Sequence, residues 1–194
     1  MNLPQRVKNL MLHPRAEWQA IDAEPHTVQD LYTGYVLILS AIPAVCGFVG
    51  LSLVGIGAFG ATYRVPIGLG VVHMAVSYLL SLGFVYLIAL AIDALAPSFG
   101  SQKSFVQALK VSAYSPTPYW VASLLTIVPS LWIVTVLVGL YSLYQLFTGL
   151  PVAMKTPADK AVPYIVVVLM ATLVLAVAIV VVTSLAMPGP VRGF

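Results

Sequence analysis

The most telling shortage in this sequence is charge. Only 8% of its 194 residues are Asp, Glu, Lys or Arg, against about 25% in ordinary soluble proteins, while 60% are hydrophobic. So few charges cannot cover that much apolar side chain in water, which excludes a soluble domain. Disorder is excluded as well, because disordered chains combine low hydrophobicity with high charge. The remaining class is an integral membrane protein, in agreement with a mean hydropathy of +1.00.

The sequence is equally poor in the residues and motifs of catalysis. Its one cysteine, Cys46, excludes a disulfide framework and a Cys-rich metal or iron–sulfur site. It contains no nucleophile elbow, zinc-protease motif or P-loop. The net charge of +3 forms no basic stripe suited to nucleic acid. We therefore predict that the protein is not an enzyme, holds no cofactor or metal, binds no nucleic acid, and has the lipid bilayer as its immediate partner.

Long stretches without charge indicate where the chain crosses the membrane, since a spanning helix takes about 20 apolar residues. The uncharged blocks are residues 31–63, 65–92, 111–154 and 162–187. The third is about twice one span in length, and Pro129-Ser130 inside it predicts a hairpin of two helices. No block shows the alternating polarity of a barrel strand, so each must satisfy its backbone as helix. The prediction is an all-α bundle of five transmembrane helices over 32–187, followed by a short tail at 188–194.

Basic residues near the predicted helix ends indicate the orientation, because they gather on the cytoplasmic side. With five crossings, the set on the side of the N-terminus is Arg6, Lys8, Arg15, Lys103, Lys110, Lys155 and Lys160. The opposite set is only Arg64 and Arg192. A single crossing in 111–154 would weaken this bias. The sequence therefore predicts a cytoplasmic N-terminus and an outer C-terminus.

Residues 1–31 form a predicted cytoplasmic amphipathic segment. Apolar residues recur at helical spacing on both sides of His13-Pro14, so we expect two short helices. One interpretation places them on the inner membrane surface, with Trp18 as an interfacial anchor. The alternative is a tail whose apolar residues pack on the helix bundle.

Glycines near the end of the first block invite two interpretations. Gly55, Gly57 and Gly60 have the spacing of a dinucleotide fingerprint, but no strand is predicted before them. We expect them to be packing glycines in the first transmembrane helix. The small-residue pair Gly57 and Ala61 then indicates helix contact within the bundle or self-association.

Two ionisable residues stand in or beside the second block. His73 lies inside it, where a hydrogen-bonded structural role competes with a proton relay or a metal ligand. Asp93 closes it and opposes the helix dipole. We expect Asp93 to pair with Lys103 or Lys110, and a role in binding cargo is the alternative.

The most informative local feature is a segment with two prolines, Tyr114-Ser115-Pro116-Thr117-Pro118. Its prolines remove two backbone donors and disfavour helix at the residues before them. Broken backbone at membrane depth needs cover from protein or water, and transporters place substrate sites there. The alternative is a plain helix start at the interface, with Tyr114, Tyr119 and Trp120 in an aromatic belt.

Several of these segments resemble, in order, motifs of the Yip domain family, small membrane proteins named for interaction with Rab-type GTPases. Residues 13–25 resemble the N-terminal segment of bacterial members, and 149–160 resemble the loop before the last helix. Asp30-Leu31-Tyr32 resembles the start of the family's Asp-Leu-Tyr-Gly-Pro motif, from which this chain departs at Thr33-Gly34. The two-proline segment resembles the family's second motif.

The resemblance implies a five-helix bundle with a cytoplasmic N-terminus, in a bacterial member that is integral and multi-pass in the cytoplasmic (inner) membrane. It also implies a small GTPase partner, as in eukaryotic members. Our leading hypothesis is a non-enzymatic adaptor or organiser that binds a membrane protein partner or lipid, or self-associates. The candidate interaction residues are Asp30, Tyr32, Asp93, Tyr114, Ser115, Pro116 and Pro118. The alternative is a small transporter or channel with a path near Pro116–Pro118, lined by His73, Ser115 and Thr117.

Overall fold

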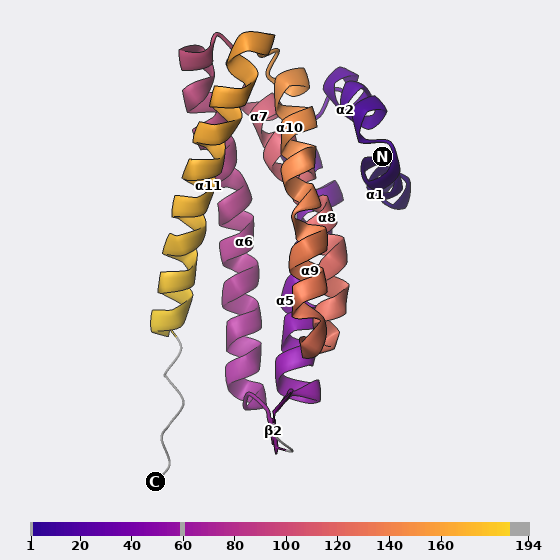
Figure 1. Cartoon of the computed structure of the whole chain (residues 1–194), viewed down its shortest axis with the longest axis vertical. Coiled ribbons are helices and arrows are strands. Elements are labelled where there is room, and N and C mark those ends of the chain that lie inside the picture. Colours follow the sequence, from indigo (N-terminus) through magenta and orange to yellow (C-terminus); the bar gives the residue numbers. More distant parts are fainter. Residues whose placement is uncertain (1, 59–60, 187–194) are drawn as a thin grey trace.

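A computed structural model describes residues 2–58 and 61–186. Most of this chain is helical, and the long helices lie along one another as a bundle (Figure 1). Four helical stretches are long and apolar enough to cross a membrane: Val28–Val54, Ile67–Phe99, Pro129–Ala153 and Ala158–Val181. The predicted all-α membrane bundle is therefore confirmed as a class. The third of the five predicted crossings falls on a shorter, broken stretch, and the predicted tail at 188–194 lies outside the described residues.

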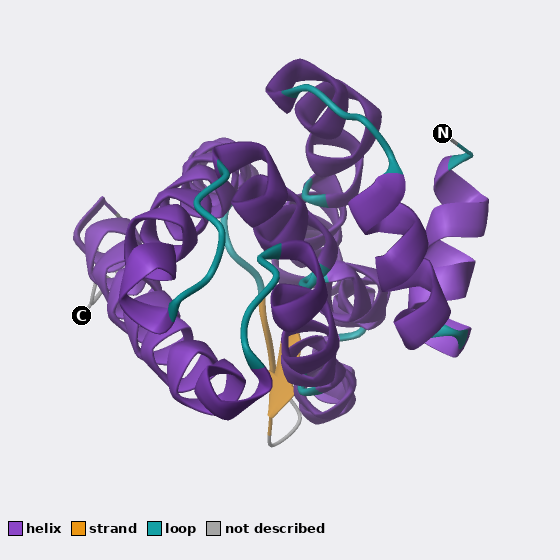
Figure 2. Cartoon of the chain, turned by 90° about the horizontal axis from the view of Figure 1, so that it is seen from above, coloured by secondary structure: helices purple, strands orange, loops and turns teal. Residues whose placement is uncertain are grey.

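Two short helices precede the bundle, as predicted: α1 (Leu3–Leu12) and α2 (Pro14–Ala23). They lie beside one end of it in Figure 1, and from above the N-terminus is at the rim (Figure 2). Leu10, Trp18 and Ile21 are fully buried against the bundle. The expected interfacial anchor at Trp18 is therefore wrong, and the packed tail is right. The indole explains why, since its N–H finds a polar partner inside the protein, as described below.

The first span is a chain of short helical pieces. It comprises α3 (Val28–Leu31), η1 (Tyr32–Val36), α4 (Leu37–Leu39), α5 (Ala41–Phe48) and η2 (Val49–Val54). Both η1 and η2 are π-helical turns, which bulge an α-helix locally.

The first span ends at Val54, earlier than its uncharged block suggested. Gly55 then adopts a φ of +88°, and β1 (Ile56–Ala58) and β2 (Ala61–Tyr63) form an antiparallel hairpin. A Cβ at Gly55 would lie 2.7–2.8 Å from atoms of the returning strand and Arg64. The expectation of packing glycines in a helix is thus wrong at Gly55 and Gly57, as is a helix contact through Gly57 and Ala61. Gly60 lies outside the described residues.

The second span, α6 (Ile67–Leu95), is one continuous helix that ends through η3 (Ala96–Phe99) and a left-handed Gly100. The chain then returns through α7 (Phe105–Tyr114), α8 (Thr117–Ala122) and η4 (Ser123–Ile127). After η5 (Pro129–Leu131) it reverses into α9 (Trp132–Gly139) and α10 (Tyr141–Ala153). Both α8 and η4 pack against α9, which confirms the hairpin expected at Pro129-Ser130. The last helix is α11 (Ala158–Ala186).

The outer surface of the bundle is apolar, as a lipid-facing surface requires. Large hydrophobic side chains on α9 and α11 are mostly exposed, among them Ile133, Leu137, Leu173, Val174 and Val177. The buried core lies between α6, α7, α10 and α11, with α2 and the start of the first span packed against it.

Candidate functional site

Tyr114, a predicted site residue, lies fully buried at the end of α7, where the N-terminal helices meet the bundle. Its ring packs edge-on against Tyr35 and Trp18, with centroid separations of 4.5 and 6.3 Å. The guanidinium carbon of Arg6 lies 5.8 Å from its centroid, within cation–π range. Tyr114 is therefore a core residue, and the interfacial belt expected as the alternative is wrong at this position.

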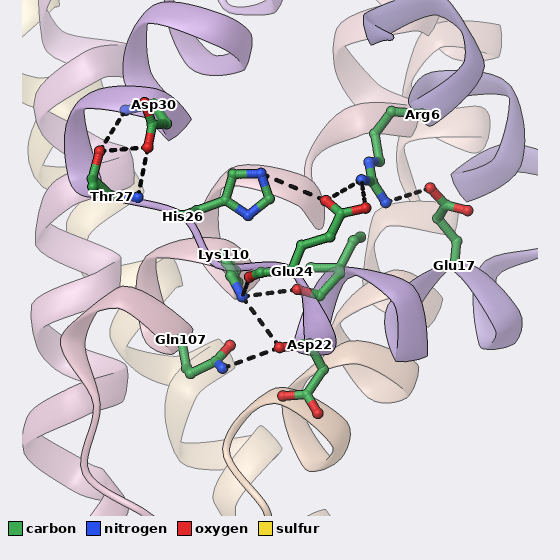
Figure 3. Close-up of polar contacts among 10 residues, drawn as sticks. Arg6, Glu17, Asp22, Glu24, His26, Thr27, Asp30, Gln107 and Lys110 are labelled. Atoms are coloured by element: carbon green, nitrogen blue, oxygen red, sulfur yellow. Dashed lines mark hydrogen bonds and ion pairs between the residues drawn. The ribbon is translucent and has the colours of Figure 1, made fainter. Parts of the chain in front are cut away.

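Arg6 joins α1 to α2 in a buried ion-pair cluster (Figure 3). It is only 6% exposed, donates to Glu17 at 2.5 Å, and donates to both carboxylate oxygens of Glu24. Asn9 also donates to Glu17, at 2.8 Å, and His26 lies 3.5 Å from Glu24. These contacts hold the two N-terminal helices together as one hairpin.

The electrostatics of the cluster favour its charged state. Burial lowers the pKa of Arg6, but the hydrogen bond to Glu24 and the charges of Glu17 and Glu24 outweigh it, so this pKa is raised overall. The hydrogen bond from Arg6 lowers the pKa of Glu24 against the opposing effect of burial. Both groups are thus charged at neutral pH.

Lys110 attaches α2 to the bundle. Its ammonium, on a side chain only 2% exposed, donates to the carbonyls of Ile21 at 2.8 Å and Glu24 at 2.7 Å. Figure 3 shows it reaching from α7 to the end of α2. The last carbonyls of a helix lack partners within it and carry partial negative charge, which a cation satisfies.

Because Lys110 caps α2, the predicted Asp93–Lys110 pair is wrong. Among the described residues Asp93 makes no ion pair, with Lys103 or any other cation, and its buried Oδ1 has no hydrogen-bond partner. The hydroxyl of Tyr164 donates at 2.5 Å to the carbonyl of Ile92, the residue before Asp93. Among the described residues, no ion pair or hydrogen bond therefore joins Asp93 to another predicted site residue.

A third attachment joins α2 to α10 through a buried amide. Gln145 is 0% exposed; it accepts from the indole N–H of Trp18 at 3.0 Å and donates to the carbonyl of Leu10. The indole lies directly on Gly149, where a Cβ would be 2.3 Å from ring carbons. Sequence reasoning missed Arg6 and Gln145. A glutamine inside an apolar helix, four residues before a glycine, was the available signal for this contact.

Asp30 and Tyr32 serve the start of the first span. Asp30 forms a capping box with Thr27, accepting from its backbone N–H at 2.9 Å and its hydroxyl at 2.6 Å. The hydroxyl of Tyr32 donates to the carbonyl of Leu82 on α6 at 2.9 Å. The structure does not bring either side chain to the proline break.

The break itself lies inside protein. Ser115 is 7% and Thr117 0% exposed, and Pro118 is buried as well. The hydroxyl of Thr117 donates to the carbonyl of Tyr114 and also hydrogen-bonds the hydroxyl of Tyr35, both at 2.6 Å. The Thr117 hydroxyl therefore satisfies the carbonyl of Tyr114, which the missing N–H of Pro118 leaves open. The break is covered by protein, as broken backbone at membrane depth requires.

A cavity of about 430 Å³ lies beside the break and brings three predicted residues together: His73, Ser115 and Pro116. It lies at mid-height, because its lining includes Ser81 at the centre of α6 and Thr172 at the centre of α11. Thr117, expected on the same path, faces Tyr35 and is not in the lining.

A second cavity, of about 850 Å³, extends toward the hairpin end, where Gly55, Ile56 and Ser130 line it. Pro43 and Tyr119 line both cavities, so the two adjoin. Toward the docked end lie the buried, mutually packed rings of Tyr114, Tyr35 and Trp18. Across residues 2–58 and 61–186, no group of three or more His, Cys, Asp or Glu could hold a metal ion.

Comparison with known proteins agrees with the resemblance of the motifs. The family model of the Yip1 domain matches residues 8–179, most of the chain. Inner membrane protein YohC of Escherichia coli, from strains K12 and O6:H1, is 28% identical over 150 residues, covering 75% of this chain and 76% of the relative. No solved structure matches significantly. The chain is therefore an integral, multi-pass protein of the inner membrane and belongs to the Yip1 domain family.

Proposed function

We propose that this protein is a non-enzymatic organiser of the cytoplasmic membrane, an adaptor whose inner end binds a membrane protein partner or lipid. The observation that carries the proposal is the fixed docking of α1 and α2. Lys110 and Gln145 hold these helices on the bundle through buried polar contacts, and Arg6 holds α1 to α2. Such contacts fix α1 and α2 at one end of the bundle, where Lys8 and Arg15 on these helices are exposed.

The proposal includes five crossings, with the third built from α7, α8 and η4. Lys110 on α7 contacts α2 at one end of the bundle. At the other end the carbonyl of Thr126 on η4 lies so near Gly50 that a Cβ there would be 2.0 Å away. These contacts at opposite ends of the bundle support a third crossing despite the break at Pro116.

The docked end carries the basic residues that the positive-inside rule assigns to the cytoplasm. Exposed ones there include Lys8, Arg15, Lys103 and Lys155, while Arg64 lies by the hairpin at the far end. This distribution supports a cytoplasmic N-terminus. A small GTPase partner follows from the family resemblance alone, and the exposed basic surface equally suits anionic lipid headgroups.

Affinity purification of the full chain in mild detergent tests the adaptor role. We expect a stoichiometric membrane protein partner or a defined dimer, and its loss in Arg6→Gln, which breaks the ion pairs that hold α1 to α2. Arg64→Gln, at an exposed position by the hairpin at the far end, is the matched control. Repeated recovery of a lone monomer together with bilayer lipid in no defined ratio would contradict the proposal.

A second candidate function, a small transporter or channel, is favoured by the two adjoining cavities. They run from the hairpin end to mid-height and reach His73 and the proline break. Cysteine accessibility tests this function in a Cys46→Ala background. A membrane-impermeant thiol reagent should modify Tyr119→Cys and Ser115→Cys from the outer side if water fills the path. Protection of both, beside a reactive Arg64→Cys control, would contradict transport.

A further inference from the structure

Hydroxyl groups are unusually frequent in the wall of the mid-height cavity. The hydroxyl residues of the lining, tyrosine aside, are Ser40, Ser77, Ser81, Ser112, Ser115, Ser142 and Thr172. Four of them donate to carbonyls three or four residues earlier in their own helices. The hydroxyl of Ser142 accepts from the backbone N–H of Tyr119. These five have partners within the protein.

Ser40 and Ser115 differ from the rest. They are 0% and 7% exposed, and neither hydroxyl has a hydrogen-bond partner among the described residues. They come from different parts of the chain, Ser40 from the middle of the first span and Ser115 from the proline break, and both line this cavity. A buried hydroxyl without a partner is costly, and a bound polar group would remove that cost.

The wall also limits the charge of an occupant. No Asp, Glu, Lys or Arg is in the lining, so a charged group held here would have no counter-ion. A phosphate or carboxylate headgroup is therefore disfavoured, and an uncharged polar group is favoured.

The rest of the lining is apolar, with Phe84, Val85, Ile88, Leu146 and Leu169 among its members. A volume of about 430 Å³ falls within the ~300–1,000 Å³ of small-molecule sites. This lining and volume suit a single aliphatic chain, and such molecules are supplied directly by the bilayer around the protein.

We propose that the mid-height cavity binds a neutral single-chain lipid with free hydroxyl groups, of the monoacylglycerol class. Its chain packs along the apolar wall, and its uncharged head hydrogen-bonds Ser40 and Ser115. This inference goes beyond the proposed function, because the cavity lies at mid-height and not at the docked end. It does not require a protein partner.

Photo-crosslinking of the purified full chain in nanodiscs tests the site. The probe is a monoacylglycerol with a diazirine in its chain, and labelled peptides are mapped by mass spectrometry. We expect labelling on cavity-lining stretches of α6, α7 and α11, and its loss on adding monoolein. Oleate and lysophosphatidylglycerol, which carry charge, should compete at least tenfold less well. Labelling spread over the outer surface, or equal competition by oleate, would overturn the proposal.

Two pairs of variants sharpen the test. Ser40→Ala with Ser115→Ala should reduce labelling several-fold, whereas Ser98→Ala, at an exposed position on η3 outside the lining, should not. Filling the cavity with Ser77→Phe should abolish labelling, whereas Ala75→Phe, exposed on the same helix, should preserve it. Undiminished labelling in the folded double alanine variant would also overturn the proposal. If a variant fails to fold, competition on the wild-type chain still decides.

A negative crosslinking result and a negative partner purification can be told apart. Crosslinking uses the isolated protein, so it succeeds or fails whether or not a partner exists. Loss of the partner in Arg6→Gln with cavity labelling retained would show that docking and lipid binding are independent.

Discussion

Arg6 is the residue on which the attachment of α1 to α2 depends most. Removing one member of a buried ion pair costs about 3–5 kcal/mol, and we expect the lower end because the Glu24 side chain is 40% exposed. Arg6→Gln should therefore lower the melting temperature and expose Lys8 and Arg15 to rapid trypsin cleavage. Arg15→Gln should change neither the melting temperature nor cleavage at Lys8, and equal behaviour of the two variants would refute the assignment.

Acid should loosen the same contact through Glu24. The pKa of this carboxyl is lowered in the folded protein from its ordinary value of 4.5, so its ion pair stabilises docking above that pH. The stabilisation is lost as the pH falls through the lowered value. Limited proteolysis of α1 between pH 6 and about pH 3 should show increasing cleavage on acidification. Glu24→Gln should be cleaved readily at every pH, and a wild-type profile in that variant would contradict the mechanism.

Individual residues also show what the sequence could predict. Tyr114, Ser115 and Pro116 stood out because prolines in an apolar block conflict with helix, and the structure places all three at a covered break. Arg6 gave no such signal, because a lone arginine in a charged N-terminal segment is typical of a solvated surface. Its burial depends on Glu17 and Glu24, whose convergence arises only from the turn at His13-Pro14.

At the scale of elements, the contact of α2 with α10 depends on the absence of a side chain. Gly149→Ala would place a methyl group within 2.3 Å of Trp18 ring carbons. Such overpacking costs about 1–3 kcal/mol, and we expect a lower melting temperature with displacement of the indole. Gly83→Ala on α6 meets nothing within 4 Å and is the control. Indole fluorescence that is unchanged in Gly149→Ala but altered in Gly83→Ala would contradict this contact.

Apolar content predicted the long helices but did not predict the β-hairpin formed by β1 and β2. The blocks behind α6 and α11 match their helices because a long uncharged run in lipid has one way to satisfy its backbone. The first block was extended to Tyr63 by the same argument, although its last part leaves the bundle as β1 and β2. Hydropathy alone does not distinguish such a hairpin from helix. The helix ends where Gly55 adopts a positive φ, and the apolar content of the sequence does not reveal a backbone conformation.

For the whole molecule, orientation depends on whether the broken segment from α7 to η4 crosses the membrane. If it crosses, the turn at Val128 lies outside, and α10 and α11 bring the chain in and out again. If it enters and returns on the same side, α9 and α10 lead outward and α11 ends inside. The C-terminus therefore differs in side between five crossings and four.

Reporter fusions decide between these topologies. With five crossings and a cytoplasmic N-terminus, alkaline phosphatase fused after Phe194 should be active and a fluorescent protein fused there should be dark. Fusions at Lys155 should show the opposite pattern, because that loop shares the cytoplasmic end with Asp22, with which Lys155 pairs. The basic residues predicted on the cytoplasmic side favour this result, because they lie at the docked end of the bundle. A fluorescent fusion at Phe194 would contradict five crossings with a cytoplasmic N-terminus.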